Sequence, residues 1–185
     1  CFRVEFIKTN HSIQDAAALA IYSPAGIVVH TGDFKVDYTP VFGDAIDLQR
    51  FGEIGKKGVL ALMCDSTNAE RLGFTNSERT VGKTFDNIFS DHTDTRIIIA
   101  TFASNVDRVQ QIINSAYKFG RKVVVEGRSM VNIISIATEL GYLQMPENTL
   151  IDIEQLKDYP DEQTVLITTE TENDMQEIPR LADKI

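Results

Sequence analysis

Two polar residues that follow predicted strands have the side chains of metal ligands. His11 follows an alternating strand and opens a loop, while Asp33 follows another strand beside Gly32, which permits a tight turn. A histidine nitrogen and a carboxylate are suitable zinc ligands, and a carboxylate can bridge two metal ions that activate water. The residue types alone also allow a simpler interpretation, in which both are ordinary polar residues of loops.

Asp65 is a third candidate because it directly follows the apolar segment 59–64, which we predict to be a buried strand. A carboxylate at a strand end can orient a ligand or a catalytic histidine. The alternative is structural, since residues 65–68 (Asp-Ser-Thr-Asn) are types that bond their own backbone in turns. Of the other histidines, His92 lies in a polar stretch typical of an exposed loop.

The elements that must position these residues change in character after Asp65. Before it the chain is rich in strands, predicted at 2–8, 17–22, 27–31 and 59–64, with a short helix at 47–54. After it, helices at 77–89, 105–119 and 130–140 alternate with apolar runs at 97–99, 123–125, 150–151 and 165–167. This alternation predicts a small doubly wound domain with a parallel sheet covered on both faces.

Ligands of such sheets bind outside the carboxyl ends of the strands. Here those ends lead into residues 101–105, 126–130 and 168–170. Ser104 and Ser129 stand where helices begin, and a helix N-terminus offers unpaired N–H groups to an anion. The simpler interpretation is that both serines are helix caps.

Composition indicates a globular protein of a reducing, cytoplasmic setting without a membrane span. The 185 residues are long enough to bury one ordinary core or two small ones. No apolar run approaches the roughly 20 residues of a membrane helix, and Cys1 and Cys64 form no Cys-x-x-Cys pair. Of the net charge of −9, residues 147–185 carry 11 acidic and 3 basic residues, which leaves −1 for residues 1–146. A basic excess between 95 and 128 is compatible with a phosphate contact or with a solvated surface.

Several motifs occur in the order seen in ribonuclease J proteins. They are Asn-His-Ser-Ile (10–13), His-Thr-Gly-Asp-Phe-Lys (30–35), Cys-Asp-Ser-Thr-Asn-Ala-Glu-Arg (64–71), Gly-Phe-Thr-Asn-Ser-Glu (73–78), Ala-Thr-Phe-Ala-Ser-Asn (100–105) and Gly-Arg-Ser-Met (127–130). The chain thus resembles an internal piece of these metallo-β-lactamase/β-CASP RNA nucleases up to about Thr169. The resemblance implies an α/β fold, with a partial metallo-β-lactamase sandwich over 1–70 and a doubly wound parallel-sheet β-CASP domain over 71–185.

By this resemblance, His11 matches a zinc ligand and Asp33 the carboxylate that bridges two zinc ions. Asp65 matches the acidic first motif of the β-CASP extension, so Asp33 and Asp65 are the expected catalytic carboxylates. The residues expected to line the nucleotide side of the RNA cleft are Ser104, Asn105, Arg128 and Ser129. The family cleaves RNA as an endonuclease and as a 5′-to-3′ exonuclease that prefers a 5′-monophosphate end. The resemblance also suggests a homo-oligomer or a complex with a paralogue.

The sequence departs from the family at three places. The His-x-His-x-Asp-His motif, expected before Cys1, and the downstream β-CASP histidines, expected beyond Ile185, are absent. With His11 and Asp33 as the recognisable ligands, the isolated chain is expected to be inactive. After Thr169, the usual Gly-Ser-Gln-Gly-Glu is replaced by Glu-Thr-Glu-Asn-Asp, whose carboxylates should repel phosphate.

Two other functions remain open at this point. One is a catalytically silent β-CASP partner that binds RNA or a nuclease paralogue. The other is a metallo-β-lactamase-fold hydrolase of a different substrate, against which the motifs at 65–68 and 127–130 argue.

Overall fold

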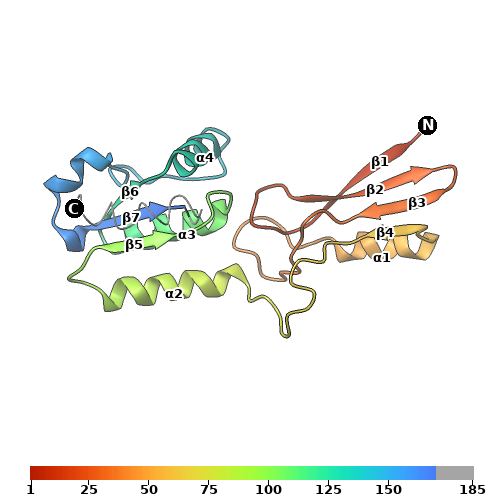
Figure 1. The fold of residues 1–185 in the computed structure, drawn as a ribbon, viewed down its shortest axis with the longest axis horizontal. Helices are drawn as coiled ribbons and strands as arrows, with labels where there is room; N and C mark the ends of the chain where they lie inside the picture. The colour runs from red at the N-terminus through yellow and green to blue at the C-terminus, as the bar shows by residue number, and fades with distance from the viewer. Residues whose placement is uncertain (170–185) are drawn as a thin grey trace. The chain divides into compact units, whose positions relative to one another are not determined.

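The computed structural model describes residues 1–169, and the chain divides into two compact units (Figure 1). The first unit is Cys1–Arg79 and the second begins at Thr80. Within residues 1–169 no helix is both long and apolar enough to cross a membrane. Each unit has its own sheet and its own buried cluster, so each is described by itself.

The first unit is built on a four-stranded sheet in the order β1-β2-β3-β4. Its strands are β1 (Arg3–Lys8), β2 (Ala17–Ser23), β3 (Gly26–His30) and β4 (Ala61–Met63). β2 pairs antiparallel with both β1 and β3, while β4 pairs parallel with β3. Strands β1, β3 and β4 therefore run in the same direction, and their carboxyl ends meet at one end of the sheet.

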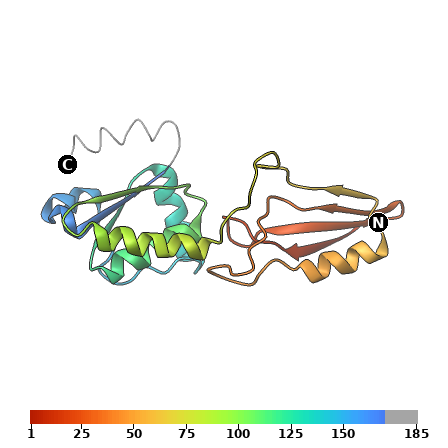
Figure 2. The same ribbon diagram turned by 90° about the horizontal axis from the view of Figure 1, so that it is seen from below.

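Helix α1 (Leu48–Lys57) lies along one face of this sheet (Figure 2). Asp47 begins it by accepting the Arg50 N–H at 2.9 Å, as an N-cap residue does. The buried cluster beneath the helix combines Ile54 with alternate residues of the strands, which are Ile7, Ala18, Ala20 and Val29. Alternation fixes the register, because a slip by one residue would turn these side chains to the other face.

The opposite face of the sheet is apolar and exposed. Phe6 is 75% exposed and Val4 48%, and by register both lie on the face away from α1.

The prediction that segment 59–64 forms a buried strand is wrong in its burial. Leu62 is 62% exposed and Met63 55%, because β4 is the edge strand of the described sheet and its pairing is with β3 alone.

The second unit is built on a parallel sheet in the order β5-β7-β6. Its strands are β5 (Ile97–Ala100), β6 (Lys122–Val125) and β7 (Thr164–Thr168). Its helices are α2 (Glu78–Asp91), whose first two residues belong to the first unit, α3 (Val106–Lys118) and α4 (Arg128–Glu139), followed by the 3₁₀ helices η1 (Ile153–Asp158) and η2 (Asp161–Gln163). The predicted run at 150–151 is a single parallel bridge from Leu150 to Val123. The parallel α/β prediction for this region is confirmed.

The two faces of this sheet are covered differently. Side chains of α2, α3 and α4 form one buried cluster with Val123, Val165 and Ile167. The alternate strand residues Val124 and Leu166 pack on the other side against Leu156 of η1. Within the described residues, the second face is therefore covered by a 3₁₀ helix rather than by an α-helix.

The α3 core gives a test of packing. Ile112 in α3 is fully buried, whereas Ile136 in α4 is 55% exposed. Replacing each by alanine removes the same atoms from a helix, so the two variants differ in the burial of the side chain. We expect Ile112→Ala to lower the free energy of unfolding by about 2–5 kcal/mol, because it leaves a cavity. Ile136→Ala should change it by about 0.5 kcal/mol or less. Urea denaturation followed by circular dichroism measures both, and equal losses would contradict the packing described.

A charged pair fastens α1 to β1. The Arg50 guanidinium donates to both carboxylate oxygens of Glu5, one bond measuring 3.0 Å, and the Tyr22 hydroxyl donates to the same carboxylate at 2.8 Å. The hydrogen bonds from Arg50, and then that from Tyr22, lower the pKa of Glu5 from 4.5 to about 2. The ionised pair thus links the helix to the strand at neutral pH.

The lowered pKa of Glu5 makes this link dependent on pH. A carboxyl whose pKa is lowered by folding stabilises the folded state above its ordinary pKa, and loses that contribution as pH falls through the folded value. We expect Arg50→Gln to destabilise the chain at pH 6 and to approach wild-type stability near pH 2. Carbon-detected NMR should find the Glu5 midpoint near 2 in the wild type and higher in the variant. A wild-type midpoint near 4.5 would rule the link out.

Candidate functional site

His11 and Asp33 come together at the carboxyl end of the first sheet. His11 lies beyond β1 and Asp33 beyond β3, and these strands run in the same direction. An antiparallel bridge between Asn10 and Lys35 holds the two loops side by side. His11 Nε2 is 3.8 Å from Asp33 Oδ2, and the side chains are 36% and 75% exposed. The pair is therefore open to a metal ion or to a substrate.

Asp65 stands at the same end of the sheet, beyond β4. Its carboxylate accepts the Thr67 N–H at 2.8 Å and the Phe34 N–H at 3.4 Å, while its own N–H donates to Thr31 Oγ1 at 2.9 Å. The hydrogen bond from the Thr67 backbone is the largest of the effects that lower the pKa of Asp65, and the charge of His11 adds a smaller one. Asp65 thus forms the turn that the simpler interpretation predicts, and it also holds the residue next to Asp33.

His30 is a residue of this site for which the sequence indicated no role. Its Nδ1 accepts the Gly32 N–H at 3.0 Å, and Gly32 has a φ of +60°. That conformation suits glycine and makes the turn that leads into Asp33. The motif 30–35 therefore contains its own turn-forming contact.

The donor set fits part of a zinc site. His11 and Asp33 offer one nitrogen and one carboxylate, which are ordinary zinc donors, at a separation that two ligands of one ion can have. Among residues 1–169, no three His, Cys, Asp or Glu side chains gather closely enough to hold a metal ion. A catalytic zinc ion takes three protein ligands, so these two residues would not complete such a site by themselves.

The second unit brings its predicted site residues to the carboxyl end of the β5-β7-β6 sheet. Asn105 is the N-cap of α3, where its Oδ1 accepts the Arg108 N–H at 3.1 Å. Helix α4 begins at Arg128 after Gly127, without a side-chain cap, so Ser129 lies in its first turn. The interpretation of Ser104 and Ser129 as helix caps is therefore wrong. Asn105 and the left-handed Gly127 (φ +96°) occupy those positions instead.

Thr101 is a residue at this sheet end that the sequence analysis did not select. Its side chain is 1% exposed, and its hydroxyl finds no hydrogen-bond partner among the described residues. Its backbone N–H donates to Thr168 O at 2.9 Å, which places it at the end of β5 beside the end of β7. A buried hydroxyl without a partner costs stability. Its sequence signal is its position as the first residue after a strand.

The basic excess between residues 95 and 128 is largely structural. Arg121 is 4% exposed and donates to the carbonyls of Thr95 and His92. Arg96 pairs with Asp161 at 2.7 Å. By contrast, Arg128 and Ser129 are exposed at the start of α4. The acidic segment that begins at Glu170 lies outside the described residues.

Comparison with known proteins finds a family model that matches part of the second unit and relatives that match most of the chain. The family model described as ribonuclease J, beta-CASP domain, matches residues 94–184. Proteins named ribonuclease J are 48% identical over 91% of this chain in Synechocystis sp., 46% over 94% in Mycobacterium tuberculosis and 41% over 98% in Thermus thermophilus. This chain spans about a quarter to a third of the length of these relatives, 26% to 31%.

The fold is also found among solved structures. A protein of unknown function from Enterococcus faecalis V583 matches 94% of this chain and 42% of its own length, with a TM-score of 0.63 and 17% identity. At this identity the likeness shows the fold alone.

The cap of α3 can be tested separately from ligand binding. Asn105→Ala removes the side-chain oxygen that accepts the Arg108 N–H, so we expect a loss of about 1 kcal/mol in the free energy of unfolding. Asn105→Asp keeps that acceptor and should retain most of the stability. Asn132→Ala, at an exposed position within α4, is the matched control and should not destabilise. An Asn105→Ala chain as stable as the wild type would show that the cap contributes nothing.

Proposed function

Because this chain belongs to the ribonuclease J family, we propose that it forms part of the active centre of a zinc-dependent ribonuclease of RNA processing and decay. The observation that supports this most is the pairing of His11 with Asp33, 3.8 Å apart and exposed at one sheet end. The reaction proposed is hydrolysis of RNA phosphodiester bonds, both as an endonuclease and as a 5′-to-3′ exonuclease, in the cytoplasm.

His11 and Asp33 would hold the metal, with Asp33 as the carboxylate shared by two zinc ions. Bound zinc would lower the pKa of a water molecule, so that hydroxide forms near neutral pH. Other residues of the chain hold these two ligands in position. Asp65 holds the Phe34 N–H beside Asp33, and His30 holds the preceding turn.

The strand ends of the second unit would bind the RNA. Arg128 and Ser129 are exposed in the first turn of α4, where N–H groups and a cationic side chain suit a phosphate. Ser104 and Asn105 lie at the corresponding end of α3, and close in sequence to both is the Thr101 hydroxyl, which has no hydrogen-bond partner among residues 1–169. We assign these residues to the nucleotide at a 5′-monophosphate end, and the complete enzyme to a homo-oligomer or a complex with a paralogue.

The first unit would be part of a metallo-β-lactamase sandwich. Its sheet has α1 on one face and exposed apolar side chains, among them Val4, Phe6 and Met63, on the other. In a two-sheet sandwich such a face packs about 10 Å from a second sheet. The exposed apolar face therefore supports this assignment.

The test exchanges this segment into a full-length ribonuclease J and measures zinc content and cleavage of 5′-monophosphorylated RNA. We expect an active, zinc-loaded enzyme in which Asp33→Ala lowers cleavage by about 100-fold or more, since even a residue that orients a ligand costs about 10- to 100-fold. Asp44→Asn, at an exposed residue near the same loops, is the control and should retain activity.

The same experiment decides between this function and a catalytically silent partner. The observation that favours the silent partner is that His11 and Asp33 have no third candidate metal ligand close by among residues 1–169. An exchanged enzyme that binds RNA but takes up no zinc and does not cleave would establish the silent partner and reject the ribonuclease assignment.

A further inference from the structure

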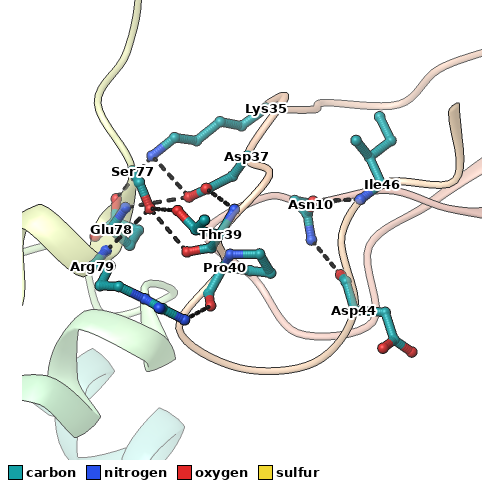
Figure 3. A network of polar contacts seen from close by, with 10 residues as sticks. All are labelled: Asn10, Lys35, Asp37, Thr39, Pro40, Asp44, Ile46, Ser77, Glu78 and Arg79. Carbon is teal, nitrogen blue, oxygen red and sulfur yellow. Dashed lines mark hydrogen bonds and ion pairs between the residues drawn. The ribbon is translucent and has the colours of Figure 1, made fainter.

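Asp37 is a buried carboxylate four residues beyond Asp33, and the proposed chemistry gives it no role. Its residue is 5% exposed, whereas the Asp33 side chain is 75% exposed. Figure 3 shows Asp37 directed towards Lys35, Thr39 and the first residues of α2. We call Lys35, Asp37, Thr39, Ser77 and Glu78 the Asp37 cluster.

The carboxylate of Asp37 joins two segments that are far apart in sequence. Oδ1 accepts the Thr39 N–H at 2.9 Å within its own loop, and Oδ2 accepts the Glu78 N–H at 3.3 Å, at the first residue of α2. Burial acts to raise the pKa of Asp37, but these N–H groups, the Ser77 hydroxyl and Lys35 lower it overall. Asp37 thus acts as an anion at the start of α2, where N–H groups and the helix dipole favour one.

A second set of bonds connects the same two segments. The Ser77 hydroxyl donates to Thr39 O at 3.0 Å, and the Thr39 hydroxyl lies 3.2 Å from Ser77 Oγ. The Arg79 guanidinium donates to Pro40 O at 3.3 Å (Figure 3). The loop that follows Asp33 is therefore fastened to residues 77–79 at several points.

Lys35 extends the cluster to the His11 loop. Its ammonium group lies 3.5 Å from Glu78 Oε1 and 4.0 Å from Asp37 Oδ2, while its backbone N–H donates to Asn10 O at 2.6 Å. The Asn10 side chain in turn accepts the Ile46 N–H at 2.7 Å and donates to Asp44 O at 2.9 Å. Asn10 precedes His11, and Lys35 lies two residues after Asp33, so one network contacts the backbone beside both residues.

We propose that Asp37 is the positioning residue for the His11–Asp33 pair. Both side chains are on exposed loops, and exposed loops are held by specific bonds rather than by a core. The buried carboxylate fixes the loop after Asp33 to the start of α2, and through Lys35 it fixes Asn10 next to His11. This inference rests on the proposed function in so far as His11 and Asp33 bind zinc.

The test uses Asp37→Ala and Asp37→Asn in this chain, with two measurements by NMR. Asp37→Ala leaves the N–H groups of Thr39 and Glu78 without their acceptor, and it leaves Glu78 as the carboxylate beside Lys35. We expect hydrogen exchange of the Lys35 and Glu78 amides to accelerate by about tenfold or more. We expect the zinc concentration that half-saturates the His11 imidazole shift to rise by about 10- to 100-fold.

Asp37→Asn is the conservative variant, because its amide oxygen can still accept the Thr39 N–H. It should rescue part of both effects. Asp44→Asn is the matched control, since Asn10 contacts the backbone carbonyl of Asp44 and the carboxylate points away from Asn10 (Figure 3). Exchange of the β2 amides, which lie in the sheet of the same unit, reports whether a variant has lost the fold of that unit.

The outcomes separate the positioning role from the zinc site. If the wild-type His11 resonance does not respond to zinc, the two donors do not hold the ion by themselves; faster Lys35 exchange in Asp37→Ala then still supports Asp37 as the residue that holds the loops. If His11 responds to zinc but Asp37→Ala changes neither the half-saturating concentration nor the Lys35 exchange, the inference is overturned. Faster exchange throughout the first unit, including the β2 amides, together with wild-type behaviour of Asp37→Asn, also overturns it.

Discussion

Strand direction in the first sheet determines where polar side chains gather. Strand β2 pairs antiparallel with β1 on one side and β3 on the other, and β4 follows β3 in parallel. The loops after three separate strands therefore emerge at one end of the sheet, and these loops carry His11, Asp33 and Asp65. The pairing register of the strands also fixes where these loops lie, because Ile7 and Val29 must stay buried under α1. The pair at 3.8 Å thus depends on strand pairing as much as on the two residues themselves.

The three carboxylates of these loops have different environments, and the difference separates support from chemistry. Asp37 and Asp65 each accept two backbone N–H groups, so their charge is used to hold the chain. Asp33 is 75% exposed, and its contact is with an imidazole. A carboxylate that is to bind a cation gains from staying accessible, whereas one that organises a loop gains from burial and N–H donors. Asp37 and Asp65 thus hold the loops through N–H groups, whereas Asp33 stays accessible.

Sequence patterns predicted the elements well because hydrophobic periodicity reports which face is buried. Each α-helix and strand of the described residues lies within a few residues of its predicted range, whereas the 3₁₀ helices η1 and η2 were not predicted. The resemblance to ribonuclease J is confirmed by the comparisons, while the site roles of His11, Asp33 and Asp65 stay predictions.

The failures concern properties that depend on neighbours distant in sequence. An apolar run cannot reveal that β4 would be an exposed edge strand, and a charge count cannot reveal that Arg121 is buried against carbonyl groups. Asp37 was missed for the same reason, since its partner Glu78 is 41 residues away.

The two faces of the first sheet show why a site at its end needs more than the loops themselves. On one side Ile54 and the strands form a closed apolar cluster that fixes β1, β2 and β3. On the other side Val4 and Phe6 remain exposed. Burial of apolar area there would stabilise the sheet by roughly 25 cal/mol for each Å² removed from water. A partner sheet would therefore stiffen the strands whose ends carry His11 and Asp33, and stiffer strands would hold the donors closer to a fixed geometry.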